Sequence, residues 1–262
     1  MDLGLKGKRA IVTGASGGIG RACALELSRE GARICLTARN EQTLESIAKE
    51  IREAGGEGIF VVADLTSLDD CKKVLAAAAG KFGGIDILVN TAGAAGAGDI
   101  LNLDVQLLTD ALSLKTYGGL RLAQLVIPHM KKNRWGRILN IAGAAGMSPA
   151  RGNMPTSFAN ITVLNTTRAL SDAVSGDGIL INTICPGTTN TQRARNRLQR
   201  RADQEGKSLE KVYQEEGNKV PAGRIAEPEE IGRAACFLCS EANSYIFGSS
   251  LYMDGGGRRG IP

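Results

Sequence analysis

The stretch TGASGGIG, from Thr13 to Gly20, stands between a short apolar run and a longer amphipathic one. A glycine-rich turn between a strand and a helix is typical of dinucleotide-binding proteins. Gly14 would permit a tight turn, and Gly18 would let the backbone approach a pyrophosphate. Gly20 would let the helix and the strand pack closely. The helix start adds free N–H groups and a partial positive charge for phosphates. Alone, the pattern also fits an ordinary tight loop, so its surroundings matter.

The rest of the chain alternates short runs rich in Val, Ile and Leu with longer amphipathic runs. The short runs, expected as buried parallel strands, are Arg9–Thr13, Arg33–Thr37, Gly58–Ala63, Ile85–Asn90, Arg137–Ile141, Leu180–Ile184 and Ser249–Met253. The expected helices are Ile19–Glu30, Glu41–Ala54, Leu68–Phe82, Leu103–Lys132, Pro155–Val174 and one that opens at Pro228. This order predicts an α/β fold: a single domain, residues 1–262, with a doubly wound, Rossmann-like parallel sheet between two helix layers. Ligands of such sheets bind at the carboxyl ends of the strands.

Composition excludes several classes of protein. The chain has 262 residues, 43% of them hydrophobic and 23% charged, which argues against disorder and fibrous repeats. A net charge of +5 is too small to predict nucleic-acid binding, and no apolar run is long enough to span a membrane. One His and six scattered Cys predict no metal site, and the pair Cys236 and Cys239 is read as buried on one helix face. Without a signal-peptide pattern, we expect a cytoplasmic protein with reduced cysteines.

The end of the second expected strand bears on the cofactor. A carboxylate there would bind the adenosine ribose hydroxyls, but the sequence reads Thr37, Ala38, Arg39, Asn40, with no acid until Glu41. The guanidinium of Arg39 could instead hold a 2′-phosphate in bidentate fashion, which favours NADP(H) over NAD(H). The alternative is that Arg39 is a solvated surface charge.

Several motifs together resemble the short-chain dehydrogenase/reductase family, over essentially the whole chain. They are the TGASGGIG turn, Asp64-Leu65, NTAG at 90–93, NTICPGTTNT at 182–191 and DGG at 254–256. The resemblance implies an oxidoreductase with a nicotinamide cofactor. Together with Arg39, it assigns the cofactor to Gly14, Ser16, Gly17, Gly18, Ile19, Gly20, Arg39, Asp64, Leu65, Asn90, Ala92, Gly93, Pro186, Gly187, Thr189 and Thr191.

The family's proton-transfer residues are not found in this chain. The family uses a Tyr and a Lys four residues later on one helix, a Ser after the preceding strand, and an Asn on the middle helix. Counted from flanking residues, these positions carry Thr156, Asn160, Gly143 and Lys115, in that order, and nowhere does a Lys follow a Tyr by four residues. The resemblance therefore implies an atypical member.

Lys115 is the candidate catalytic residue. A cation at that position could stabilise an alkoxide or enolate, and a partly buried lysine could transfer a proton. The alternatives are a bound water in the role of the missing phenol, or a lysine that is merely on the surface or holds a backbone carbonyl. A second reading of the function also stays open: a cofactor-binding protein without standard redox activity, acting as a sensor, a partner subunit or a non-redox enzyme.

The segment 188–222 is expected to form a substrate lid, by resemblance to the family. Its arginines predict a small-molecule substrate that is anionic, although acidic neighbours allow a solvated amphipathic helix instead; they are Arg193, Arg195, Arg197, Arg200 and Arg201. The resemblance also implies a homo-oligomer, a tetramer or a dimer.

Overall fold

The computed structural model describes residues 2–93 and 98–259. Its centre is a parallel sheet of seven strands in the order β3-β2-β1-β4-β5-β6-β7. The strands are β1 (Arg9–Thr13), β2 (Arg33–Ala38), β3 (Gly58–Val62), β4 (Ile87–Asn90), β5 (Gly136–Ile141), β6 (Ile179–Pro186) and β7 (Ser250–Met253). The order reverses between β1 and β4, which is where a doubly wound sheet leaves a crevice for ligands. The predicted fold class is confirmed.

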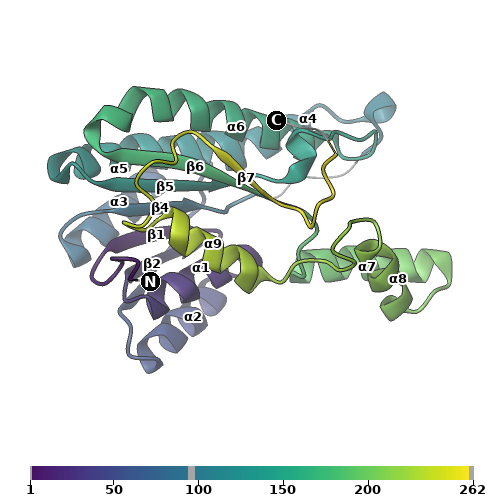
Figure 1. Cartoon of the computed structure of the whole chain (residues 1–262), viewed down its shortest axis with the longest axis horizontal. Helices are drawn as coiled ribbons and strands as arrows, with labels where there is room; N and C mark the ends of the chain where they lie inside the picture. Colours follow the sequence, from purple (N-terminus) through teal and green to yellow (C-terminus); the bar gives the residue numbers. More distant parts are fainter. Residues whose placement is uncertain (1, 94–97, 260–262) are drawn as a thin grey trace.

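Helices cover both faces of the sheet (Figure 1). One face carries α1 (Gly18–Arg29), α2 (Glu41–Glu53) and α9 (Pro228–Leu238), and the other carries α3 (Leu68–Phe82), α5 (Gly118–Asn133) and α6 (Met154–Val174). Each layer has its own apolar core, with Leu27, Leu36 and Ile231 on the first side and Leu88, Leu122 and Met130 on the second. Burial on both sides explains why the central strands are apolar at successive positions rather than alternating.

The expected helix Leu103–Lys132 is wrong as a single element. The structure has a 3₁₀ turn η1 (Ile100–Asn102), a short α4 (Gln106–Ala111), a π-helical turn η2 (Leu112–Tyr117), and then α5. The wider hydrogen-bonding pattern of a π turn changes which residues share a face. The apolar pattern of the sequence does not announce this change. Such turns are frequent at functional sites.

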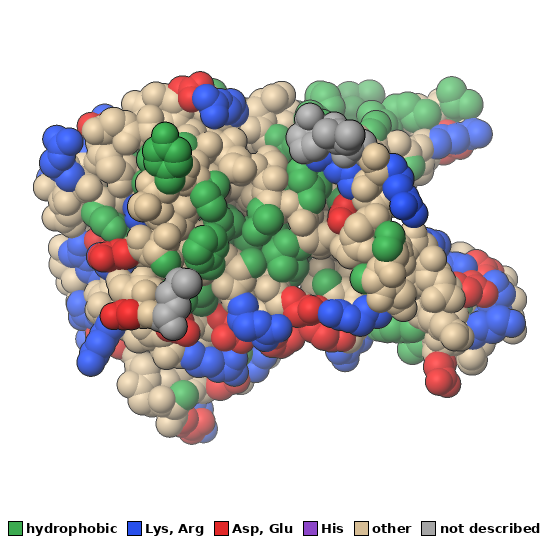
Figure 2. Space-filling model, in the orientation of Figure 1, with side chains coloured by type: hydrophobic (Ala, Val, Ile, Leu, Met, Phe, Trp, Pro, Cys, Tyr) green, Lys and Arg blue, Asp and Glu red, His purple; other side chains and the backbone are tan. Residues whose placement is uncertain are grey.

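The segment 188–222 leaves the body of the domain. It contains α7 (Gln192–Glu205) and α8 (Leu209–Gly217), which project beyond the sheet (Figure 1). Positive and negative side chains are intermixed over this projection (Figure 2). Its small apolar core consists of Leu198, Ala202 and Val212. The segment starts where β6 ends, so it lies at the carboxyl edge of the sheet.

All six cysteines are free and buried, and Cys236 and Cys239 lie in or directly after α9. Burial raises the pKa of the Cys239 thiol to about 12, as expected of an unreactive core residue. In residues 2–93 and 98–259 no side-chain group is arranged to hold a metal, and no helix there is long and apolar enough to cross a membrane.

Candidate active site

A large cleft opens at the carboxyl ends of β1, β2 and β4, and its volume is about 560 Å³. This is within the usual range for a small-molecule or cofactor site. The walls are the turn before α1, the ends of β2 and β4, the π turn η2 and the beginning of α7. Of the residues assigned to the cofactor from the sequence, those that line it are Gly14, Ser16, Gly17, Gly18, Ile19, Gly20, Arg39, Asp64, Leu65, Ala92, Gly93, Pro186 and Thr191.

The glycine-rich turn fits a pyrophosphate. Gly14 has a φ of 60°, and a Cβ atom there would lie 2.8 Å from the backbone nitrogen of Ala92. A Cβ atom at Gly20 would collide with the carbonyl oxygen of Gly14, so helix and strand could not approach as they do. The residue before α1, Gly17, has no side chain to cap the helix, so the first N–H groups of α1 stay available to an anion.

The other end of the cleft suits the adenosine half of a dinucleotide. Arg39 is exposed at the cleft wall. The pKa of Asp64 is lowered mainly by the hydrogen bonds that its carboxylate accepts from Thr66, and to a smaller extent by the charge of Arg39. Thr37 also lines the cleft, and its buried hydroxyl has no partner among the described residues. An unpartnered buried hydroxyl beside a cleft is a group that a ligand can satisfy.

Three residues assigned to the cofactor from the sequence do not line the cleft. The amide of Asn90 is buried and donates to Oδ1 of Asn140 at 3.0 Å, so it joins β4 to β5. Gly187 packs so closely on Asp254 that a Cβ atom would lie 3.0 Å from the Cα atom of that residue. The hydroxyl of Thr189 donates back to the carbonyl of Gly187. The contacts of these three residues are with neighbouring parts of the protein and not with the cleft.

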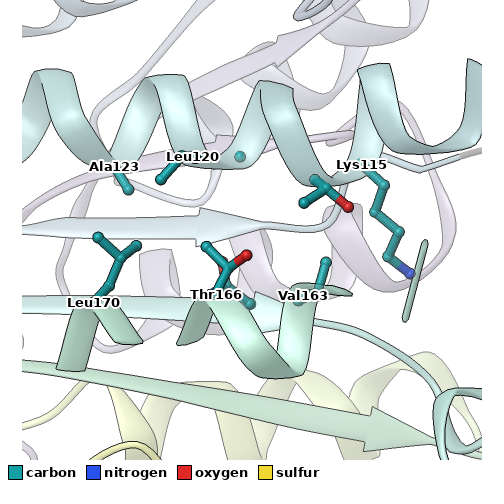
Figure 3. Close-up of a pocket in the computed structure, with 9 residues that line it drawn as sticks. Lys115, Leu120, Ala123, Val163, Thr166 and Leu170 are labelled. Carbon is teal, nitrogen blue, oxygen red and sulfur yellow. The ribbon is translucent and has the colours of Figure 1, made fainter. Parts of the chain in front are cut away.

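Lys115 lies at the end of the cleft opposite Arg39. It is placed there by the π turn η2, and its stem passes Gly93, where a Cβ atom would lie 3.0 Å from Cδ of the lysine. The ammonium donates to the carbonyl of Ala142 at 2.9 Å and to Oδ1 of Asn160 at 2.5 Å. Figure 3 shows this nitrogen pointing away from the small cavity between α5 and α6, which Leu120 and Leu170 help to line.

The surroundings of Lys115 make it a weaker base than an exposed lysine. Burial lowers its pKa to about 8, and the positive charge of Arg193 adds to this effect. At neutral pH the side chain is therefore an ammonium that can give up a proton easily. A pKa close to the working pH is what general acid–base catalysis requires.

The other positions of the family's proton-transfer set are arranged differently from Lys115. Thr156 is half-buried in the first turn of α6, Gly143 follows β5, and neither lines the cleft. Asn160 is buried, and its amide contacts the Lys115 ammonium directly. Among the described residues that line the cleft there is no tyrosine. Tyr117, two residues after Lys115, is exposed.

Two of the five arginines of the segment 188–222 face acidic partners of the same segment, and Arg195 instead donates to the side-chain oxygen of Asn190 at 2.9 Å. Arg197 pairs with Glu216 at 3.0 Å, and Arg201 pairs with Glu205 at 2.7 Å. Arg193 differs, because it lines the cleft and approaches the carbonyl of Gly93 at 3.5 Å. The pair Arg201–Glu205 is local, four residues apart within α7, whereas the pair Arg197–Glu216 depends on how α7 packs against α8 and could not be predicted from the sequence.

Comparison with known proteins gives consistent matches over the whole chain. A family model described as enoyl-(acyl carrier protein) reductase matches residues 14–257. The 3-oxoacyl-(acyl-carrier-protein) reductase FabG of Vibrio cholerae is 32% identical over 256 residues, covering 97% of this chain and 98% of the relative. A putative ketoacyl reductase of Streptomyces coelicolor is 31% identical over 249 residues, covering 94% and 95%.

Solved structures of two reductases also match nearly the whole length of this chain. L-sorbose reductase from Gluconobacter frateurii, in complex with NADPH and L-sorbose, superposes with a TM-score of 0.96 at 29% identity and full coverage of both chains. An actinorhodin polyketide ketoreductase with NADPH superposes with a TM-score of 0.91 at 31% identity, covering 95% of this chain and 97% of the other.

Proposed function

The chain belongs to the short-chain dehydrogenase/reductase family of oxidoreductases, and from this premise we propose that it is an NADP(H)-dependent enzyme that interconverts a carbonyl and an alcohol by an atypical mechanism. The observation that carries the proposal is Lys115, an ammonium with a lowered pKa at the cleft end opposite Arg39. The absence of a Tyr followed four residues later by a Lys makes the mechanism atypical.

Preference for NADP(H) is supported by charge and by similarity. Arg39 is the side chain at the end of β2 that can pair with a 2′-phosphate, since its guanidinium presents two parallel N–H groups to such an anion. Two similar structures, L-sorbose reductase and the actinorhodin ketoreductase, contain NADPH. The glycine turn and the uncapped start of α1 suit the pyrophosphate of either cofactor, so they do not discriminate.

The proton of the reaction comes from Lys115 in this proposal. When bound, the reduced nicotinamide supplies a hydride to the carbonyl carbon. The Lys115 ammonium hydrogen-bonds the carbonyl oxygen, stabilises the negative charge that develops there, and donates one proton to it. The product is an alcohol and the lysine becomes a neutral amine, which takes up a proton from solvent. Alcohol oxidation runs the same steps backwards, with the neutral amine accepting the hydroxyl proton.

An anionic small molecule is the proposed substrate class. Lys115 and Arg193 both line the same part of the cleft, and the charge of Arg193 is felt at Lys115. The carboxylate Asp64 lies at the other end and is already hydrogen-bonded to Thr66. A substrate carboxylate, phosphate or carrier thioester with acidic groups would therefore meet a positive field as it enters.

The test combines cofactor binding with turnover. NADPH and NADH are titrated by fluorescence, and loss of the reduced cofactor is followed by absorbance with a panel of carbonyl substrates, with and without carboxylates. Turnover that Lys115→Met lowers by about 10² to 10⁴-fold supports the mechanism. The control is Lys132→Met, an exposed lysine at the end of α5. Turnover unchanged in Lys115→Met would overturn it.

The alternative, a cofactor-binding protein without redox activity, is not favoured, because the similar proteins are described as reductases. Tight NADPH binding without turnover on any substrate would revive it. We also infer a cytoplasmic location, which six free buried cysteines suit, and a homo-oligomer. Exposed apolar side chains near α4 and α6 support the homo-oligomer, namely Leu101, Val105, Tyr117 and Phe158. Light scattering on the purified protein tests the oligomer, and a monomer would refute it.

A further inference from the structure

Three residues from three different elements meet around the side-chain amide of Asn160. Lys115 comes from the π turn η2, Asn160 from the second turn of α6, and Gly143 from the loop after β5. Asn160 is only 2% exposed, so its amide has lost its water and must find partners within the protein. The amide oxygen has such a partner, because Oδ1 of Asn160 accepts a hydrogen bond from the Lys115 ammonium at 2.5 Å.

The opposite side of the same amide explains the glycine at 143. A Cβ atom on residue 143 would lie 2.7 Å from Nδ2 of Asn160, closer than carbon and nitrogen can approach without a shift. The φ of Gly143 is 163°, an extended conformation that any residue adopts, so backbone freedom does not require glycine here. The requirement is space for the Asn160 amide.

From these contacts we propose that Asn160 is a positioning residue for Lys115, and that Gly143 is needed because it leaves room for the Asn160 amide. The inference rests on the proposed function, since it concerns how the proton donor is held. Asn160 does not line the cleft, so it acts on substrate only through the lysine. A charged lysine has three donors and no acceptor, which requires the oxygen of the amide, and not its NH₂ group, to face it.

The contacts among Lys115, Asn160 and Gly143 also explain together three departures from the family's pattern. The positions where the family carries Asn and Lys are occupied here by Lys115 and Asn160, and these two side chains contact each other. The positive charge therefore lies between the middle helix and α6, as the family's pattern implies, but the lysine that carries it comes from η2 instead of from α6. With the amide turned toward the lysine, residue 143 cannot carry the hydroxymethyl group of a serine.

The pH response of Lys115 is the diagnostic measurement, because a merely structural role of Asn160 would not move it. Apart from Asn160, the ammonium is bonded to the carbonyl of Ala142, and the titratable groups that act on it are Arg193 of α7, which lowers its pKa, and Cys185 of β6, which raises it. Asn160→Leu removes the acceptor, and Gly143→Ala pushes the amide away. Both changes remove a hydrogen bond to the charged form, so both lower the pKa of Lys115. Asn160→Asp places a carboxylate there and raises it.

The experiment has two readouts. One is an NMR titration of the lysine side-chain signals of the cofactor-free protein, with the Lys115 signal assigned by its loss in Lys115→Met. The other is the dependence of kcat on pH. We expect Asn160→Leu and Gly143→Ala to lower kcat at least about tenfold, shift both titrations in the same direction, and leave NADPH binding within about twofold. The double variant should be no worse than the more severe single variant, because both changes break one contact.

The control is Ser171→Ala, a buried substitution nearer the carboxyl end of α6 that leaves all three residues in place. If Lys115→Met abolishes turnover but Asn160→Leu and Gly143→Ala leave kcat and both titrations unchanged, the positioning role is refuted and the proposed function survives. If Lys115→Met leaves turnover intact, the proposed mechanism itself fails. In that case the NMR titration still decides whether Asn160 and Gly143 control the ammonium.

Discussion

A Cβ atom at Gly18 would lie 2.9 Å from Cγ2 of Thr191, so the glycine-rich turn and the beginning of α7 touch across the cleft. Thr191 caps α7 by accepting a hydrogen bond from the backbone N–H of Ala194 at 3.2 Å. The turn before α1 and the projecting α7–α8 segment are therefore in direct contact, although more than 170 residues separate them in the sequence. This contact joins the expected pyrophosphate site to the expected substrate side.

Replacing Gly18 by alanine should weaken cofactor binding strongly. The backbone there has a φ of 54°, which costs an alanine about 1–2 kcal/mol, and the new methyl group collides with Thr191. We expect the Kd for NADPH to rise at least about tenfold, as fluorescence titration would show. Gly55→Ala is the matched control, because it has a φ of 84° and open space around it. Equal weakening in both variants would mean that the loss of binding comes from a general effect of backbone strain on the fold and not from the position of Gly18 in the cleft.

Arg39→Ala should separate the two cofactors. Loss of the guanidinium removes a bidentate partner of a 2′-phosphate, so the Kd for NADPH should rise about 10- to 100-fold. The Kd for NADH should change less than about twofold, since that cofactor has no such phosphate. Titrations are compared with Arg233→Ala, an exposed arginine of α9 outside the cleft. Equal losses for both cofactors would contradict the assignment of Arg39.

The direction of the reaction should depend on pH through Lys115. Its pKa is lowered to about 8, so the ammonium predominates below that pH and the neutral amine above it. Carbonyl reduction needs the proton, and its kcat should decline as the pH rises through 8. Alcohol oxidation needs the free amine and should increase over the same range.

Arg193→Ala should move this transition to higher pH, because the positive charge of Arg193 contributes to the lowered pKa. Steady-state rates measured over the pH range in both directions provide the check. A profile that keeps the same midpoint in Lys115→Arg, whose guanidinium does not titrate there, would exclude Lys115 as the titrating group.

A half-buried ion pair at the amino edge of the sheet should control stability and not activity. Asp86 is 6% exposed and accepts from the Nη2, Nε and backbone N–H groups of Arg9, at 2.6, 2.7 and 2.9 Å. Asp86→Ala leaves the half-buried Arg9 without this partner, and the free energy of unfolding should fall by about 1.5–3 kcal/mol. Denaturant titration measures the loss.

The exposed pair between Lys72 and Asp69 is the control, because such pairs contribute less than about 1 kcal/mol. Arg9 begins β1 and Asp86 precedes β4, so both lie at the amino edge of the sheet, away from the cleft. The folded Asp86→Ala protein should keep its kcat within about twofold. If Asp86→Ala lost turnover but kept its stability, the Arg9–Asp86 pair would serve activity instead of stability, contrary to this prediction.

Much of the fold could be predicted from the sequence because helices cover both faces of the central strands. The middle residues of a strand such as β1 had to be apolar at successive positions, and the helices between the strands had to be amphipathic, so both signals are strong in the sequence. The π turn η2 has no comparable signal. Its extra residue changes the helical register without changing composition, and the expected single helix Leu103–Lys132 is wrong for that reason.

The site was predictable only where local sequence determines geometry. The glycine turn and Arg39 are local features, and the structure places both at the cleft. Asn90 belongs to an equally recognisable motif, yet its partner Asn140 lies 50 residues away and turns the amide into the interior. The contact between Lys115 and Asn160 spans 45 residues and depends on how η2 packs against α6. No spacing rule in the sequence reports such a pair.

Compared with a regular α-helix, a π turn contains one extra residue, and η2 accommodates it within a stretch of six residues. Deleting one of them would restore regular spacing and turn the helix before the deletion by about 100° relative to the helix after it. If Lys115 moves with that rotation, its ammonium swings out of reach of Asn160. The protein would gain a regular helix and lose the position of its proposed proton donor. The irregular turn is therefore the feature of the backbone on which the proposed chemistry depends.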